Sequence, residues 1–437
     1  MKRTLIANGP VCDGISVCLN PGALLIEDGR ITALGDPAEV REAARKRPAP
    51  GPEPEVLDVG GRLILPGFLN PHHHLYSFLA VGLSPRGSTA DFGEILSNIW
   101  WPLDAALEKE SIYLSALLGL IDSVRHGVTA VFDHHASMSC VRGSLDTIAR
   151  AFTLAGVKGA LCFECSDRRG KAALKEQIEE NLDFAARHRS HDLLAGCLGL
   201  HANLTLSDAS LTNIASRRPA DLPIHVHCGE DRSDLEHCRS LGYDGPLQRL
   251  AAFGLVDRKA ILAHAVHLAE EDYRLLNEIG CLVVANPESN ANNHVGRMPR
   301  TRIPRFLLGT DGMSGDIVAA LRSDHLLAEE PDSPAASAAA LFRHKAEALQ
   351  NFFADSGSLR VGMRADIAVL DYIPLTPLSA ENLLGHLIFG AKNGRAWATF
   401  SEGRLLYLDG KILFCDEEAA TDEARRAARE LHRRYYG

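Results

Sequence analysis

Three consecutive histidines follow an apolar run near the start of the chain. The run is interrupted by a Pro-Gly pair and leads directly into His72, His73 and His74. This pattern is typical of a strand, a turn and a second, buried strand. Because side chains alternate along a strand, we expect His72 and His74 on one side and His73 on the other. Two imidazoles at one strand end can bind a single metal ion, and a histidine-rich polar loop is the alternative.

A fourth histidine and a nearby carboxylate follow a later apolar run. His227 comes after Ile224–Val226, and Glu230 lies three residues further on. A carboxylate beside a metal-bound water can take its proton and pass it to a leaving group. His225 has the same facing as His227 but lies deeper in the strand. We therefore expect His227 as a metal ligand and His225 as a hydrogen-bonded inner residue.

Two further polar residues follow apolar runs in the second half of the chain. His264 is placed to contact the attacking water or the substrate, and Asp311 lies in a Thr-Asp-Gly turn. Such a turn is common, but its position after a strand makes Asp311 the candidate for the last ligand. Three imidazoles and one carboxylate suit one divalent metal, Zn²⁺ or Fe²⁺, better than Mg²⁺ or Ca²⁺. Such an ion lowers the pKa of a bound water to about 7.

These residues need a scaffold that brings distant strand ends together. Short apolar runs alternate with helical stretches, which predicts a parallel sheet. The runs are Gly67–Leu69, Val128–Phe132, Ala160–Phe163, Leu198–Leu200, Ile224–Val226, Ala260–Ala263, Leu282–Ala285 and Phe306–Leu308. The helical stretches include 109–126, 172–188 and 269–279. Eight strands of this kind predict an α/β fold, a (β/α)₈ TIM-like barrel, whose active site lies at the carboxyl ends of the strands.

Both ends of the chain have the short runs and turns of a β-rich domain. Asp28-Gly29 and Asp409-Gly410 are hairpin signals, and a Pro-rich stretch at 48–54 predicts a surface loop. We expect both ends to form one small composite β-sandwich, with an amphipathic helix over 416–436. The expected domains are 1–65 (first part of the sandwich), 66–354 (metal-dependent barrel) and 355–437 (second part and C-terminal helix).

Composition limits the partners. The 437 residues carry a net charge of -10 and no Lys/Arg tract, which argues against nucleic acid. No apolar stretch approaches the roughly 18 residues that cross a membrane, and the start of the chain does not resemble a signal peptide. The ten cysteines are scattered, mostly within apolar runs, which predicts reduced core thiols, Cys162 and Cys165 included, and a cytoplasmic location. The expected partner is a small-molecule substrate. The sequence does not determine whether the chain forms a homo-oligomer.

Taken together, these motifs resemble the amidohydrolase superfamily, in its cytosine-deaminase and chlorohydrolase-like branch. The matching stretches are Pro66–Asn70, His72-x-His74, His227-x-x-Glu230, His264, Asn286-Pro287-x-Ser289-Asn290 and Gly309–Gly312. Within that branch the chain is most similar to the SsnA group of aminohydrolases. That similarity rests on Trp100–Asp104, Asp133–Ser137, Gly143–Leu145, Asn292–Gly296 and Gly385–Gly390, and it covers nearly the whole chain.

The resemblance implies a role for each motif residue. The implied metal ligands are His72, His74, His227 and Asp311. Glu230 is implied as the proton shuttle and His264 as the group that stabilises the attacking water and the tetrahedral intermediate, so the expected catalytic residues are Glu230, His264 and Asp311. The chain departs from the family pattern at Pro71, His73 and Glu288, which leaves the ligands intact but puts substrate specificity in doubt.

Many binuclear members of this superfamily bridge two metals with a carboxylated lysine at a strand end. Here the third and fourth runs are followed by Glu164 and His201, and Lys158 lies at the other end of its run. We therefore expect a single metal, with a pair bridged by Glu164 as the alternative.

The candidate substrate-binding residues are aromatic or imidazole side chains in the predicted loops. They are Trp100, Trp101, His134, His135, His201 and His294. The alternative for each is a purely structural role in the core or in a loop. Aromatic faces beside imidazoles suit a planar N-heterocycle. The expected reaction is hydrolytic deamination of such a ring, a cleavage of a non-peptide C–N bond. The alternatives are hydrolysis of a ring amide or a C–halogen bond, and a barrel that binds a metal or ligand without turnover.

Overall fold

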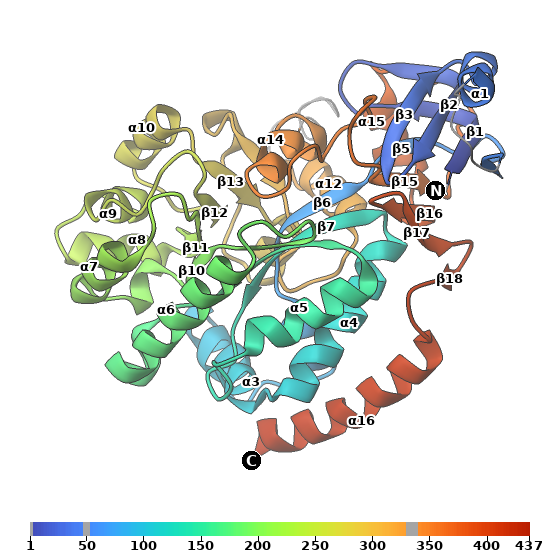
Figure 1. The fold of residues 1–437 in the computed structure, drawn as a ribbon. Coiled ribbons are helices and arrows are strands. Elements are labelled where there is room, and N and C mark those ends of the chain that lie inside the picture. The colour runs from blue at the N-terminus through green and yellow to red at the C-terminus, as the bar shows by residue number, and fades with distance from the viewer. Residues whose placement is uncertain (1–2, 47–52, 329–339) are drawn as a thin grey trace.

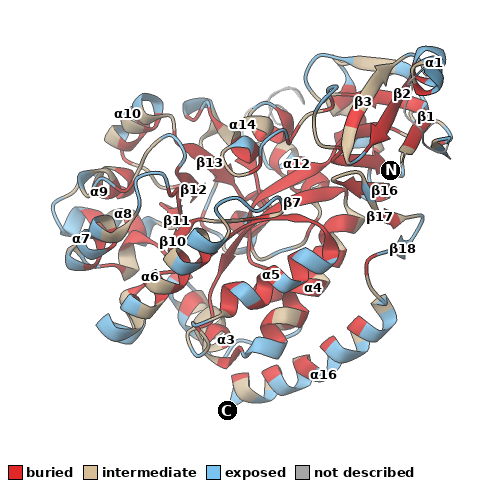
Figure 2. Ribbon diagram, in the orientation of Figure 1, coloured by how far each residue is buried: buried red, intermediate tan, exposed pale blue. Residues whose placement is uncertain are grey.

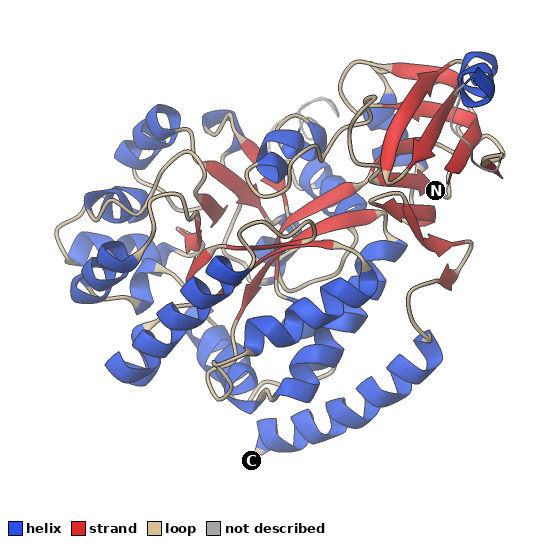
Figure 3. Ribbon diagram, in the orientation of Figure 1, coloured by secondary structure: helices blue, strands red, loops and turns tan. Residues whose placement is uncertain are grey.

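The computed structural model describes residues 3–46, 53–328 and 340–437. Parallel strands lie in the middle of the larger region and helices cover them on the outside (Figure 3). A smaller β-rich region lies to one side and contains the N-terminus (Figure 1). The fold is therefore mixed α/β. The Pro-rich loop expected at 48–54 falls mostly on residues 47–52, which lie outside the described residues.

The central strands form two parallel sheets, ordered β6-β7-β8-β9 and β10-β11-β12-β13-β14. Their bounds are β6 (Phe68–His73), β7 (Val128–His135), β8 (Lys158–Phe163), β9 (Leu194–Gly196), β10 (Leu198–Leu200), β11 (Ile224–Cys228), β12 (Ile261–His264), β13 (Leu282–Ala285) and β14 (Phe306–Leu308). Each of the eight expected runs overlaps one of these strands. The additional strand β9 is separated from β10 by Cys197 alone.

Single parallel bridges connect the two sheets at both of their edges. One bridge joins Cys165 to Leu200, and the other joins His73 to Asp311. The strands are buried on both faces (Figure 2), and alternate residues contribute to different cores. On β7, Phe132 packs in a cluster with Phe353, whereas Val131 belongs to the larger cluster that includes the surrounding helices. This alternation is what places neighbouring residues at a strand end in different environments.

The helical segments follow the strands along the chain. The longer ones are α4 (Lys109–Arg125), α5 (Ser144–Ala155), α6 (Gly170–Arg187), α7 (Asp208–Arg217), α8 (Arg232–Ser240), α10 (Glu270–Ile279) and α12 (Ile317–Leu326). The shorter ones are η1 (Leu75–Ala80), α2 (Phe92–Ile95), η2 (Leu96–Trp100), α3 (Trp101–Ala106), η3 (Asp167–Arg169), η4 (Asn203–Thr205), α9 (Pro246–Ala252), α11 (Pro287–Asn292), η5 (Arg300–Arg302), α14 (Lys345–Gln350), α15 (Leu383–Gly385) and η6 (His386–Gly390). The predictions over 109–126, 172–188 and 269–279 correspond to α4, α6 and α10.

The two chain ends share one nine-stranded sheet, because β5 pairs antiparallel with β15. Its elements are β1 (Arg3–Cys12), β2 (Cys18–Glu27), β3 (Arg30–Gly35), β4 (Glu55–Asp58), β5 (Ile64–Pro66), β15 (Ile367–Leu370), β16 (Ala396–Ser401), β17 (Arg404–Leu408) and β18 (Lys411–Ile412), with the unpredicted helix α1 (Pro37–Lys46). The two chain ends therefore form one β-rich unit, as expected, and its nine strands are hydrogen-bonded into one continuous sheet. Irregularities beside Gly9 bend β1, so that its first half pairs with β4 and its second half with β5.

The cysteine prediction holds in the core but not in the first hairpin. Cys162, Cys165, Cys197, Cys228 and Cys281 are free and buried, as expected. In contrast, Cys12 and Cys18 form a disulfide, because β1 and β2 place them directly opposite each other. This corrects the expectation that all ten are reduced.

Lys158 joins the central strands to the nine-stranded sheet. Its Nζ lies 2.9 Å from both carboxylate oxygens of Asp366 and 2.5 Å from Glu402 Oε1. The Lys158 side chain is only 1% exposed, and a buried charge requires such partners. Lys158 therefore has a structural role at the amino end of β8, in agreement with the sequence-based argument against a metal-bridging lysine.

The last helix, α16 (Glu417–Tyr436), matches the prediction and packs along α4 and α3 (Figure 1). Its buried residues recur every three or four positions and end with Leu431 and Tyr435. The Tyr435 hydroxyl donates a hydrogen bond to the carbonyl of Asn98 in η2. Among the described helices, none has both the length and the apolar character needed to cross a membrane.

Candidate active site

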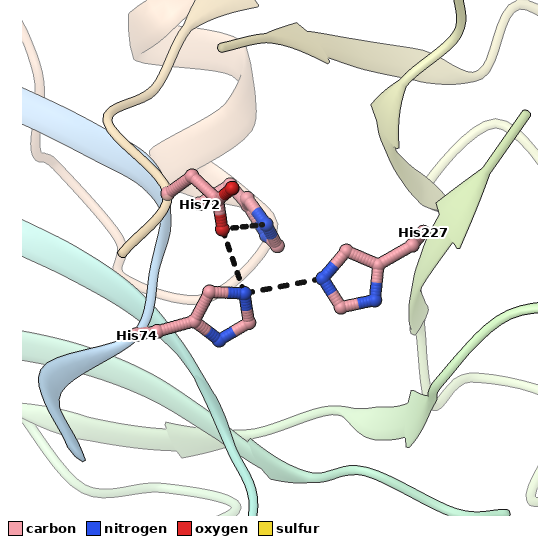
Figure 4. A group of neighbouring side chains, drawn as sticks. His72, His74 and His227 are labelled. Carbon is pink, nitrogen blue, oxygen red and sulfur yellow. Dashed lines mark hydrogen bonds and ion pairs between the residues drawn. The ribbon is translucent and has the colours of Figure 1, made fainter. Parts of the chain in front are cut away.

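Four side chains from three strand ends converge on one another (Figure 4). His72 and His74 come from the end of β6, His227 from β11, and Asp311 from the loop after β14. His74 Nε2 lies 2.8 Å from Asp311 Oδ1 and 3.1 Å from His227 Nε2. One nitrogen or oxygen from each of the four residues lies within 4.8 Å of the others. The structure thus brings together the four residues expected as metal ligands.

Hydrogen bonds at the outer ring nitrogens prepare this cluster for a cation. Nδ1 of His74 lies 2.5 Å from the carbonyl oxygen of His134, and Nδ1 of His227 lies 2.8 Å from that of His201. A carbonyl oxygen only accepts, so each Nδ1 carries the proton, and Nε2 of the neutral ring is a bare lone pair. Two such nitrogens facing each other repel unless a positive charge lies between them. The residues therefore fit a divalent metal ion.

The electrostatics of His74 point in the same direction. Burial lowers its pKa, but the Asp311 carboxylate more than offsets this and raises the pKa of His74 to about 9. His72 behaves differently, since burial holds its pKa well below the usual value. Its Nδ1 lies 2.8 Å from Nε2 of His225, which is fully buried, as expected of an inner residue. The cluster is therefore a place where one positive charge is favoured.

The backbone at Asp311 is held in a left-handed conformation, with φ of +53°. Such a conformation costs a non-glycine residue about 1–3 kcal/mol and needs support from its surroundings. His73 supplies part of it, because its Nδ1 donates to the Asp311 carbonyl oxygen at 2.5 Å. The Asp311 amide donates to the His72 carbonyl, and Ser289 Oγ donates to Asp311 Oδ2. His73 points away from the cluster, as predicted, and helps to fix the carboxylate that completes it.

Glu230 and His264 lie beside the cluster. Glu230 Oε2 is 3.5 Å from His264 Nε2, which in turn is 4.0 Å from Asp311 Oδ2. Nδ1 of His264 lies 2.8 Å from Asn290 Oδ1, which orients the ring. Burial raises the pKa of Glu230 to about 7, so this carboxyl group can both accept and release a proton near neutral pH. The three residues expected to be catalytic therefore face one another.

A pocket with an empty volume of about 680 Å³ opens onto these residues. Its apolar lining consists of Phe92, Leu96, Trp100, Trp101 and Met313. Its polar and remaining lining consists of His74, Tyr76, Asp104, Glu164, His201, His227, Glu230, Ser289, Asn292, Asn293, Asp311 and Gly312. Aromatic side chains on one part of the wall and carboxylates on another suit a flat polar molecule.

The structure divides the residues expected to bind substrate. Trp101 and His201 line the pocket, and so does Trp100. His134 is fully buried and is not among the described residues of the pocket lining, and its Nε2 contacts the carbonyl oxygens of Leu200 and His225. Strand alternation turns its neighbour His135 the other way, where it is buried against Ser137 and Phe163.

His294 also lies outside the described pocket lining. It follows α11 in a left-handed conformation, with φ of +54°, and its side chain is exposed. Sequence reasoning also missed two residues. Asp104 lies at the end of the Trp100–Asp104 stretch but was not singled out, and Arg168 follows no strand end and gave no signal.

Glu164 was expected only as a possible metal bridge. Oxygen or nitrogen atoms of Glu164, His134 and His227 do lie within 4.8 Å of one another. However, Arg168 Nη2 lies 2.5 Å from Glu164 Oε1, so a guanidinium already neutralises this carboxylate.

Comparisons with known proteins agree with this geometry. The amidohydrolase family matches residues 63–406, and an imidazolonepropionase-like composite domain of bacteria matches residues 22–45. The 5-methylthioadenosine/S-adenosylhomocysteine deaminase of Pyrococcus furiosus is 28% identical over 96% of this chain and 98% of its own. The 5'-deoxyadenosine deaminase of Methanosarcina barkeri is 26% identical over 94% of each chain.

Two solved structures share the fold over most of the chain. An adenosine deaminase from Xanthomonas campestris with bound zinc superimposes with a TM-score of 0.84 at 24% identity and covers 98% of each chain. E. coli guanine deaminase superimposes with a TM-score of 0.76 at 18% identity, covering 93% of this chain and 99% of its own.

Proposed function

The chain belongs to the amidohydrolase family, and from that premise we propose that it is a metal-dependent aminohydrolase that removes an amino group from a small planar N-heterocycle. One observation carries the proposal. The His/Asp cluster and Glu230 open onto a single pocket whose other walls are aromatic and carboxylate side chains. The two relatives identified above by sequence, from Pyrococcus furiosus and Methanosarcina barkeri, are named as deaminases of adenosine derivatives. We extend that class of substrate to this chain.

We propose that the central strands close into a (β/α)₈ barrel, with domain limits near 1–65, 66–354 and 355–437. The bridges Cys165–Leu200 and His73–Asp311 support closure, since they connect the edges of the two parallel sheets. In such barrels the active site lies at the carboxyl ends of the strands. The residues of the pocket lie at or after the ends of β6, β8, β10, β11, β13 and β14, which fits that rule.

The proposed metal ligands are Nε2 of His72, His74 and His227, and the carboxylate of Asp311. When bound there, a divalent ion would supply a water whose pKa is lowered to about 7. The mutually facing Nε2 atoms of His74 and His227, 3.1 Å apart, support this assignment more strongly than the spacing of the histidines alone. The ligand set accepts zinc and iron alike.

The protein's own groups then handle the protons. Glu230 takes a proton from the attacking water and delivers it to the leaving nitrogen, while a C–O bond forms and the C–N bond breaks. His264, held by Asn290, stabilises the developing negative oxygen of the tetrahedral carbon. Ammonia leaves and the ring keeps an oxo group. Asn293 Nδ2 lies 3.4 Å from Glu230 Oε1 and orients the shuttle.

Screening amino-substituted purines and pyrimidines with zinc-loaded enzyme should detect ammonia release together with conversion of the ring to its oxo form. Halide-substituted rings and cyclic amides provide the comparison, because the same site can in principle hydrolyse either. Halide release or ring opening without ammonia would replace deamination by one of these reactions. If the rings bound but no product formed, the alternative of a barrel that binds a metal or ligand without turnover would be supported.

Protein purified without added metal should contain about one zinc or iron ion per chain, because one set of four donors converges in the described part of the chain. Elemental analysis measures this directly. Glu164→Gln should leave the content unchanged, since Arg168 already neutralises Glu164 in the described structure. A content near two, falling to one in Glu164→Gln, would establish the bridged pair instead.

A further inference from the structure

Arg168 lies beside the pocket, largely covered, and each of its three guanidinium nitrogens donates a hydrogen bond. Nη1 donates to Asp104 Oδ2 at 2.7 Å, Nη2 to Glu164 Oε1 at 2.5 Å, and Nε to Ser166 Oγ at 3.3 Å. The guanidinium also lies over the ring of Trp101, 5.1 Å from its centre. Among the described residues that line the pocket, both carboxylates are present and Arg168 is absent. A bound molecule therefore meets the carboxylates, with the positive charge behind them.

Each carboxylate keeps one oxygen for a ligand. Within the described part of the chain, Asp104 Oδ1 and Glu164 Oε2 receive no hydrogen bond. The two side chains are only 4% and 5% exposed, and both line the pocket. Burial is the main cause that raises the pKa of Asp104 to about 7, the Arg168 charge opposes it, and the nearby Glu164 carboxylate adds a smaller increase.

The rest of the lining reinforces this polarity. Glu230 and Asp311 add two more carboxylates to the same pocket. Nε1 of Trp101 is buried without a partner among the described residues, which leaves one donor for an acceptor such as a ring nitrogen. The wall thus offers several carboxylate oxygens as acceptors, and Trp101 adds a neutral donor.

We propose that Asp104 and Glu164, held in place by Arg168, form an acceptor subsite that selects heterocycles carrying N–H, amino or hydroxyl donors and rejects those carrying a carboxylate or phosphate. This inference rests on the proposed function, because it describes the specificity of the same pocket. A neutral or cationic substituent gains charge-assisted hydrogen bonds to the free oxygens. An anionic substituent meets like charges in a site from which water is largely excluded.

Binding of unreactive rings tests the subsite without relying on turnover. The probes are three 6-methylpurines, which have no amino group to lose, with 2-hydroxyethyl, 2-aminoethyl or carboxymethyl at N9. Calorimetry with zinc-loaded protein at pH 8, above the pKa of Asp104, measures each dissociation constant. We expect the hydroxyethyl and aminoethyl compounds to bind about tenfold or more tightly than the carboxymethyl compound, the scale of a like-charge penalty in a buried site. Equal or tighter binding of the carboxymethyl compound overturns the proposal.

Two variants locate the selectivity. Glu164→Gln and Asp104→Asn should each reduce the preference severalfold, mainly by tightening carboxymethyl binding. Glu270 lies on α10 and forms an exposed ion pair with Arg302. Glu270→Gln removes the same charge there and should leave the preference unchanged. Thermal melts followed by circular dichroism establish that each variant is folded, and Asp104→Asn decides the question if Glu164→Gln does not fold. An unchanged preference in the folded variants overturns the assignment.

The two proposals fail in different ways. If no amino-heterocycle releases ammonia, the proposed function is wrong, whereas the order of affinities among the 6-methylpurines still decides the subsite. If ammonia is released but the carboxymethyl compound binds best, the subsite is wrong and the chemistry stands.

Discussion

His227→Ala should abolish both metal binding and activity. His227 is the only one of the four proposed ligands on β11, and its Nε2 faces His74 Nε2 at 3.1 Å. Removing it leaves three donors and a gap that water must fill, while the strand itself is unchanged. Elemental analysis after purification should give well below one equivalent of metal, because the variant lacks one of the four convergent donors and its bond to the metal.

His237→Ala is the matched control for this variant. His237 lies in the neighbouring helix α8, is only partly buried and is not a member of the cluster. It should retain metal and ammonia release at the wild-type level. Full metal content in His227→Ala would mean that another histidine completes the set, and His225, which contacts His72, would be examined first.

Strand positions and the polar residues that follow them could be read from the sequence. His72, His227 and Asp311 were predicted together because polar residues after buried parallel strands meet at one edge of a sheet. The direction of a side chain was predictable only where the alternation along a strand separates neighbouring residues, as it separates His73 from His72 and His74. His134 and His135 show the limit: the sequence places both at a strand end, but it does not reveal how deep in the strands the pocket begins.

Long-range contacts account for what could not be predicted. Arg168 lies in a short helical turn with no apolar pattern, and its importance depends on meeting Asp104 and Glu164 from two other segments. The Cys12–Cys18 pair depends on the register of one hairpin, and a bulge beside Gly9 shifts such a register. The continuous sheet at the chain ends likewise depends on the bend in β1, which lets this strand pair with both β4 and β5. The local sequence pattern does not predict that bend.

Glu230→Gln should retain the metal but lose most of the turnover. Glutamine keeps the size of the side chain and a carbonyl oxygen that Asn293 Nδ2 can approach, as it does Glu230 Oε1 at 3.4 Å. It cannot accept the proton of the attacking water, because an amide has no basic lone pair near neutral pH. The expected loss in kcat is about 10²–10⁴-fold, the usual contribution of general acid–base catalysis. Steady-state ammonia release measures it, alongside elemental analysis of the same preparation.

The pair of readouts distinguishes a proton shuttle from a ligand. His227→Ala should lose metal and activity together, whereas Glu230→Gln should lose activity alone. Glu236→Gln, on the exposed face of α8, is the control for removing one negative charge from the same region and should leave kcat unchanged. If Glu230→Gln kept near-normal turnover with full metal content, another group would have to carry the proton. His264 would be the first candidate, because its Nε2 lies 3.5 Å from Glu230 and has no hydrogen-bond partner among the described residues.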